Sequence, residues 1–158
     1  VELMGTGMIG SGRQNIAQNI PKTLIHAPLE LLANLRAERG LSYLFIAHDL
    51  PAVAQVCDRV LVMYLGRIVE SGPARAVLAD PLHPYTRALV DAVPTIDAIR
   101  KPDPFILRGD PPSPLNPPSG CALHPRCPLA TAQCAAERPE LRRFSDGRQV
   151  ACWVGLDR

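Results

Sequence analysis

Long apolar runs and clustered positive charge are both missing from this sequence, and each absence excludes a class of protein. The longest apolar run, Val60 to Leu65, is far shorter than the roughly 20 residues that a membrane-spanning helix needs. The first residues also lack the basic region and the apolar run of a secretory signal peptide. With a net charge of +2 and no dense Lys/Arg cluster, the chain lacks the electrostatic signature of a nucleic-acid-binding protein.

Aromatic residues are also few, whereas proline is abundant. Aromatics make up 4% of the 158 residues, and 17 residues are proline. This composition predicts long extended segments beside a modest core. Apolar residues make up 47%, which is enough for one domain, or for one small domain with an appendage. The chain starts at Val1 rather than Met, which fits a fragment or an incomplete reading frame.

Helical and strand patterns alternate through the first half of the chain, after a glycine-rich start. Pro28 to Arg39 predicts a helix that Gly40 ends, and the apolar run Leu41 to Ala47 predicts a buried strand. A helix followed by such a strand is typical of a parallel sheet in an α/β protein. The other expected helices are Gln14–Ile20, Leu50–Val56, Ala74–Ala79 and Pro84–Val93, and the expected strand pair is Arg59–Tyr64 with Arg67–Glu70, followed by a break at Ser71–Pro73.

From Pro94 onward the sequence changes character. Residues 94–120 are rich in proline and have almost no periodicity, so they should run extended over a surface. Residues 121–158 carry four cysteines and one expected helical turn at Ala130–Ala136. The fold class predicted from these patterns is α/β, with an irregular, cysteine-bearing extension.

The four late cysteines follow the spacing C-x5-C-x6-C-x17-C. These residues are Cys121, Cys127, Cys134 and Cys152. Four thiolates can enclose an iron–sulfur cluster or a structural zinc ion, and a third reading is reduced thiols or a late disulfide. The spacings exceed those of common zinc knuckles, which favours the larger cluster.

Several other residues can be interpreted in functional or in structural terms. His124 is a spare ligand or a surface residue of the loop, and Trp153 is expected to shield the cysteines. Cys57 follows an apolar helix and is expected to be a small buried residue. His83, next to Pro84, is expected to cap and dock a helix.

Three stretches of the chain together resemble one family. The first is YLFIAHDL at residues 43–50, followed by DRVLVMYLGRIVESG at 58–72; the second is DPLHPYTRAL at 80–89. The third is GDPPSPL at 109–115, followed by GCALHPRCP at 120–128. The chain resembles, over roughly residues 29–158, the C-terminal part of ATP-binding subunits of oligopeptide and dipeptide ABC transporters.

The resemblance implies an ABC ATPase that couples ATP hydrolysis, with Mg²⁺, to uptake of short peptides. It implies a partial ATPase domain at 24–79 and the family's C-terminal extension at 80–158, after a poorly assignable start at 1–23. The implied partners are a homologous second ATP-binding subunit and transmembrane permease subunits. The implied location is peripheral, on the cytoplasmic face of the inner membrane.

The resemblance also assigns roles to site residues. His48 corresponds to the switch histidine that contacts the γ-phosphate of ATP. A histidine just past the carboxyl end of a strand lies where α/β sheets bind ligands, although it can also end a strand with no catalytic task. Some members of the family carry a 4Fe–4S cluster in the extension, which relates the four cysteines to that cofactor more than to zinc.

Other parts of an ATPase site are not found. The nearest match to a phosphate cradle, Gly5 to Ser11, has no lysine, and Thr23 to Pro28 has no pair of adjacent carboxylates. The segment Gly10 to Gln14 departs from the family's signature in the order of its residues. We therefore expect that the chain does not hydrolyse ATP by itself.

Two other functions remain open. One is a stand-alone iron–sulfur or zinc module with a structural or redox role, built from the last residues. The other is a dinucleotide-binding protein, because Gly5, Gly7 and Gly10 satisfy G-x-G-x-x-G and Glu30 follows downstream.

Overall fold

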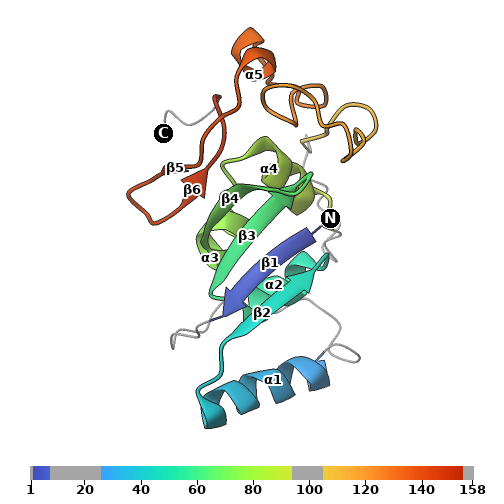
Figure 1. The fold of residues 1–158 in the computed structure, drawn as a ribbon. Coiled ribbons are helices and arrows are strands. Elements are labelled where there is room, and N and C mark those ends of the chain that lie inside the picture. The colour runs from blue at the N-terminus through green and yellow to red at the C-terminus, as the bar shows by residue number, and fades with distance from the viewer. Residues whose placement is uncertain (1, 8–25, 94–104, 155–158) are drawn as a thin grey trace.

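A six-stranded sheet with helices forms an α/β structure in this computed structural model, which describes residues 2–7, 26–93 and 105–154 (Figure 1). The strand order is β2-β1-β3-β4-β6-β5. The strands are β1 (Glu2–Gly7), β2 (Tyr43–Ala47), β3 (Arg59–Tyr64), β4 (Arg67–Pro73), β5 (Arg142–Arg143) and β6 (Gln149–Val150).

Every strand pairing among the described residues is antiparallel, so the prediction of a parallel sheet is wrong here. The cause is β1, a strand that was not expected from the sequence pattern. It lies between β2 and β3 and runs antiparallel to both, so the apolar strand β2 finds its hydrogen-bond partner in the glycine-rich start of the chain.

Five helices are described: α1 (His26–Arg39), α2 (Leu50–Val56), α3 (Ala74–Ala79), α4 (Pro84–Asp91) and α5 (Ala132–Ala136). Each confirms a predicted helix to within a few residues, whereas the helix predicted at Gln14–Ile20 lies outside the described residues. Gly40 ends α1 with φ +63°, and its N–H donates to the carbonyl of Arg36 at 2.9 Å. Asp49 caps α2, because its Oδ1 accepts from the N–H of Ala52 at 3.3 Å.

The hairpin of β3 and β4 is confirmed, and its turn follows from the residues in it. Leu65 and Gly66 both have positive φ, 46° and 74°, as a two-residue turn between twisted strands requires. The break predicted at Ser71–Pro73 is wrong, since these residues belong to β4. Ser71 pairs with Gln149 of β6, so the C-terminal extension prolongs the strand.

The hydrophobic core crosses from the first half of the chain into the extension. Val53, Val60, Val62 and Val77 are at most 1% exposed, and Leu123 of the extension, at 2%, belongs to the same cluster. The extension therefore packs as part of the domain, because both its β6 strand and its loop side chains complete structures begun upstream.

The sheet has an exposed apolar edge at β2. Leu44 and Ile46 of this strand are 62% and 58% exposed, so the strand predicted to be buried is covered only in part. Helix α1 lies beyond β2 (Figure 1) and is tied to the body by the ion pair of Arg36 with Asp58 at 3.2 Å. Among the described residues, no helix combines the length and apolar character needed to cross a bilayer.

A buried carboxylate joins β4 to α4. Glu70 of β4 is 0% exposed, and its two oxygens accept the N–H groups of Leu82 and His83 at 3.0 and 2.9 Å. Burial raises the pKa of Glu70, while these two amides, the Thr86 hydroxyl and the Arg148 guanidinium lower it. The carboxylate thus satisfies two backbone donors that the chain buries just before α4.

His83 is the cap predicted for this helix, and it is almost fully buried, at 1% exposed. Its Nδ1 accepts from the N–H of Tyr85 at 3.1 Å, and its other ring nitrogen donates to the carbonyl of Ala151. Burial lowers the pKa of His83 to about 3, against the smaller raising effect of the Ala151 hydrogen bond. The imidazole is therefore neutral in the fold and ties α4 to the residue that follows β6.

We predict that His83 makes the stability of the fold fall as pH is lowered from 7.5 to 5. The unfolded imidazole binds a proton near pH 6.5, whereas the folded one does so only near pH 3, so the unfolded state binds more protons in between. The contribution lost is about 2 kcal/mol at pH 5. Urea denaturation of the native chain and of His83→Asn, which keeps a capping side chain, measures this difference at each pH.

The raised pKa of Glu70 acts in the opposite direction, but Glu70 is present in both proteins and cancels in the difference. A stability difference that stays constant between pH 7.5 and 5 would contradict a buried neutral His83.

Candidate functional site

Among the described residues, the site residues predicted from the sequence lie in two regions: the end of β2 and the cysteine-bearing loops. His48 follows β2 directly and is exposed, and the next residue, Asp49, caps α2. The imidazole therefore stands at a strand-to-helix junction, open to solvent, where a ligand can reach it.

The four late cysteines come together from separate loops of the extension. The N–H of Cys121 donates to the carbonyl of Cys134 at 2.8 Å, so the segments around these two residues are in direct contact. Cys127 ends a tight turn, with its N–H donating to the carbonyl of Leu123 at 3.0 Å. Cys127, Cys134 and Cys152 are buried, Cys121 is half-buried, and all four are free thiols.

Burial and mutual proximity both act on these thiols. Burial is the largest cause that raises the pKa of Cys152, to about 11; the neighbouring Cys121, Cys127 and Cys134 contribute to the rise, and a hydrogen bond to the Val154 carbonyl opposes it. The pKa values of Cys121 and Cys127 are also raised, first by burial. The thiols of Cys121, Cys127 and Cys152 are therefore protonated at neutral pH, and the four late cysteines are close enough to act on one another electrostatically.

The four late cysteines do not have the geometry of a metal site in this structure. Within the residues that the structure describes, no three His, Cys, Asp or Glu side chains meet closely enough to hold a metal ion. Two of the sulfurs are engaged locally: Cys134 Sγ lies 3.4 Å from the Thr131 hydroxyl, and Cys152 Sγ lies 3.2 Å from the Val154 carbonyl. A shared ion or cluster would require the thiols to move toward one another.

The residues around the cysteines have structural contacts. His124 is half-buried, with Nδ1 at 3.0 Å from the carbonyl of Cys121. The Trp153 indole donates to the carbonyl of Glu137 at 3.0 Å, and the Arg142 guanidinium lies 5.6 Å from the centre of its ring. Trp153 thus fixes the chain that follows Cys152.

Cys57 is buried in the core at 9% exposure, as predicted. The glycine-rich fingerprint does not have the geometry of a dinucleotide site. Gly5 and Gly7 lie within strand β1 rather than in a turn after it, Gly10 lies outside the described residues, and Glu30 is exposed on α1. Most of the stretches compared with a phosphate cradle, an acidic pair and a signature also lie outside the described residues.

Sequence reasoning missed the polar side chains that hold the extension in place. Arg148 donates to the carbonyl of Asp80 at 2.5 Å and pairs with Asp146 at 2.6 Å. Its stem covers Gly72, where an added Cβ would lie 2.7 Å from Arg148 Cγ. No local sequence pattern predicts the contacts of Arg148 with Asp80 and Gly72, because these partners are far from it in the sequence.

Several of the known proteins that this chain resembles have names or descriptions that refer to peptide transport. Residues 69–134 match the family model described as "Oligopeptide/dipeptide transporter, C-terminal region". A probable peptide ABC transporter ATP-binding protein, y4tS of Sinorhizobium fredii, is 54% identical over 126 residues, which are 80% of this chain and 36% of the relative.

Two further relatives have similar names. The dipeptide transport ATP-binding protein DppF of Haemophilus influenzae is 45% identical over 125 residues, which are 79% of this chain and 38% of that protein. The di/tripeptide transport ATP-binding protein DppF of Pseudomonas aeruginosa is 51% identical over 128 residues, with 78% and 38% covered. The chain therefore spans less than two-fifths of the length of these curated relatives.

We predict that Gly120→Ala disrupts the cysteine loops far more than Gly109→Ala. Both glycines have a left-handed φ, +61° and +56°, which costs alanine about 1 kcal/mol at either position. Only at Gly120 would the new Cβ also meet backbone, 2.4 Å from the carbonyl oxygen of Cys134, and such overpacking adds about 2 kcal/mol.

Chemical denaturation and the rate of thiol labelling by a soluble disulfide reagent measure the two effects. Labelling of the four late cysteines should accelerate in Gly120→Ala and stay near native in Gly109→Ala. Equal destabilisation by the two substitutions would show that the close approach of Gly120 to Cys134 does not limit which side chain fits at position 120.

Proposed function

The chain belongs, through its C-terminal region, to the family of oligopeptide/dipeptide transporter ATP-binding proteins, and on that premise we propose its function. It acts as the C-terminal part of an ATP-binding subunit in an ABC importer that couples ATP hydrolysis to uptake of short peptides. The observation that carries the proposal is the 45–54% identity to proteins named for peptide transport, together with the family match over residues 69–134.

His48 is the proposed contact to the γ-phosphate of ATP. Its position after β2 and its exposure support this role, since an imidazole there can donate a hydrogen bond to a phosphate oxygen. Asp49 fixes the backbone of the junction by capping α2, so His48 is held on a rigid element. In the γ-phosphate contact, the histidine would orient the phosphate and the attacking water, and the charge of the phosphates would be neutralised by a Mg²⁺ ion when one is bound with ATP.

Hydrolysis needs more than this contact. Phosphoryl transfer requires a phosphate cradle and a magnesium ligand, and the sequence contains no G-x-x-x-x-G-K-[ST] pattern. We therefore infer that these 158 residues are not catalytic alone and that the cradle is supplied from outside them. The proposed partners are a homologous second ATP-binding subunit and the permease subunits at the cytoplasmic face of the membrane.

A chimera tests this function and the role of His48 together. Residues 29–158 would replace the corresponding segment of the Haemophilus influenzae DppF relative within its assembled transporter. The chimera should support ATP-driven dipeptide uptake, and His48→Ala should reduce ATP hydrolysis roughly a hundredfold while nucleotide binding persists.

Ser42→Ala, an exposed change just before the same strand, is the matched control and should leave hydrolysis unchanged. An inactive but correctly assembled chimera would refute the proposed function. Full hydrolysis by His48→Ala in an active chimera would refute only the role of the histidine.

The four late cysteines are the proposed ligands of a 4Fe–4S cluster. Their mutual proximity, their thiol chemistry and their loop-borne spacing support this, since a cluster is larger than a zinc ion and tolerates wider separation. Because no three of the described candidates meet at metal distance, binding must draw the thiols together and release their protons. Zinc and reduced thiols are the competing states.

A stand-alone metal module, the second function considered, finds less support. Strand β6 pairs with β4, and Leu123 and Cys127 pack into the same core as Val60. The last residues therefore depend on the first half of the chain for their packing, and a cluster here would stabilise the extension within the larger subunit.

Metal analysis of protein purified without oxygen tests the cluster. We expect iron and acid-labile sulfide in comparable amounts, lost in Cys127→Ser and retained in the matched variant Cys57→Ser, whose thiol belongs to the core. Zinc without iron would replace the cluster with a structural ion. Absence of both metals would refute a metal site.

A further inference from the structure

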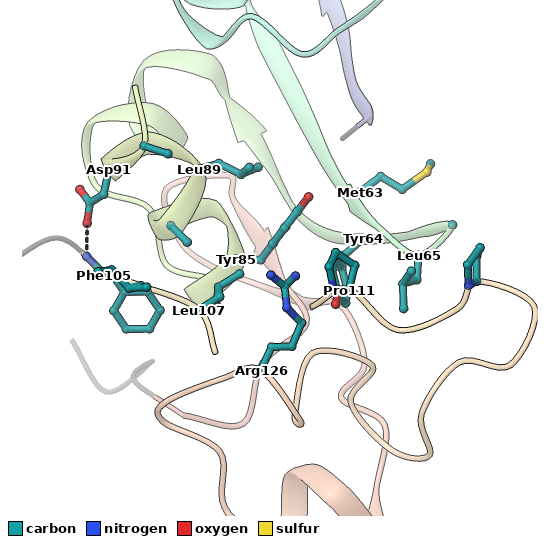
Figure 2. A pocket seen from close by; sticks show the side chains of 15 residues that line it. Met63, Tyr64, Leu65, Tyr85, Leu89, Asp91, Phe105, Leu107, Pro111 and Arg126 are labelled. Atoms are coloured by element: carbon teal, nitrogen blue, oxygen red, sulfur yellow. Dashed lines mark hydrogen bonds between the residues drawn. The ribbon is translucent and has the colours of Figure 1, made fainter. Parts of the chain in front are cut away.

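The residues that line a further pocket, which is partly aromatic, include neither His48 nor any of the four late cysteines. It has a volume of about 750 Å³, within the usual range for small-molecule sites. Three parts of the chain line it: the turn between β3 and β4, helix α4, and the extended segment from Phe105 to Arg126 (Figure 2). Its described lining residues are mostly apolar, and they include the aromatic rings of Tyr64, Tyr85 and Phe105 and two prolines, Pro111 and Pro114.

Tyr64 brings an unsatisfied polar group to the pocket wall. The residue is 5% exposed, and its hydroxyl is buried with no hydrogen-bond partner among the described residues. Its ring packs on Tyr85, with ring centroids 4.7 Å apart and planes tilted by 53°, so the hydroxyl cannot turn freely toward solvent. A buried hydroxyl without a partner costs free energy that a ligand oxygen would recover.

Arg126 brings a positive charge to the same wall. Its Nε donates to the carbonyls of Arg108 and Gly109, both at 3.2 Å, which fixes the guanidinium and leaves its terminal nitrogens outside these bonds. The charge acts on the Tyr85 hydroxyl, and Figure 2 shows Arg126 directed toward Tyr85 and Tyr64. Within the described part of the chain, no carboxylate forms an ion pair with Arg126.

Among the described lining residues, the acidic one is Asp91, and its carboxylate is already engaged. Asp91 Oδ2 accepts from the N–H of Phe105 at 3.0 Å and lies 4.0 Å from the guanidinium of Arg87. Its negative charge is therefore balanced locally, and Arg126 gives the pocket a net positive character.

We propose that this pocket binds a small carboxylate attached to an apolar body. The carboxylate would accept from the Arg126 terminal nitrogens and from the Tyr64 hydroxyl, while the apolar body would lie against Tyr85, Leu107 and the prolines. A short apolar peptide with a free C-terminus has this chemistry, and so does a medium-chain fatty acid. The site shares no residue with the proposed nucleotide contact, so its failure would leave the proposed transport function untouched.

Calorimetric titration of the full chain with two matched pairs of compounds tests the proposal. One pair is the dipeptide Leu-Phe and its C-terminal amide, and the other is octanoate and octanol. Either carboxylate should bind at least tenfold more tightly than its neutral counterpart, and the pair that does so identifies the source of the ligand. Equal binding of carboxylate and neutral compounds, or no binding of any at millimolar concentration, overturns the proposal.

Two variants separate recognition from folding. Tyr64→Phe removes one unsatisfied oxygen and keeps the ring contact with Tyr85, so it should unfold at the same denaturant concentration or a higher one. It should nevertheless bind the carboxylate about tenfold more weakly or worse, because a hydrogen bond to a charged group is lost. Arg126→Gln should lower affinity at least tenfold, whereas Arg143→Gln, an exposed arginine on β5, should not. Unchanged affinity in folded Tyr64→Phe and Arg126→Gln would also overturn the proposal.

Discussion

The buried carboxylate of Glu70 is the constraint on which the arrangement of this structure depends. The Glu70 side chain extends from β4 to the residues just before α4. Its two oxygens accept hydrogen bonds there from the backbone N–H groups of Leu82 and His83. Burial of a carboxylate is unfavourable unless its oxygens are hydrogen-bonded, and the two buried N–H groups equally need acceptors. Each group therefore requires the other, and this fixes the start of α4 against the sheet. His83 extends the connection to Ala151, just after β6.

Because of these connections, the extension is continuous with the part that resembles an ATPase. The pairing of Ser71 with Gln149, the cover that Arg148 provides over Gly72, and the burial of Leu123 in the shared core all act across the same boundary. A rigid frame of this kind holds the proline-rich loops, which have few regular hydrogen bonds of their own. It also explains how residues distant in the sequence, such as Tyr64 and Arg126, line one pocket.

The two proposed chemistries place different demands on the frame. His48 needs an exposed position at a strand end, which α2 and its Asp49 cap maintain. The cysteines need proximity to one another and protection from water, and the burial that protects them also raises the pKa of the Cys121, Cys127 and Cys152 thiols. A metal that binds thiolates must overcome that cost, so occupancy of the site and ordering of the loops are expected to be coupled.

The sequence by itself determined the elements whose signals are local: the α2 helix, the hairpin turned at Leu65 and Gly66, and the capping role of His83. Caps and turns depend on residues within a few positions of one another, so a pattern can reveal them. Only the tertiary structure decided that β2 pairs antiparallel with β1, that β4 continues through Gly72, and that an aromatic pocket forms around Tyr64 and Arg126. Those features depend on hydrogen bonds and packing between segments far apart in the chain, and periodicity and spacing carry no record of such partners.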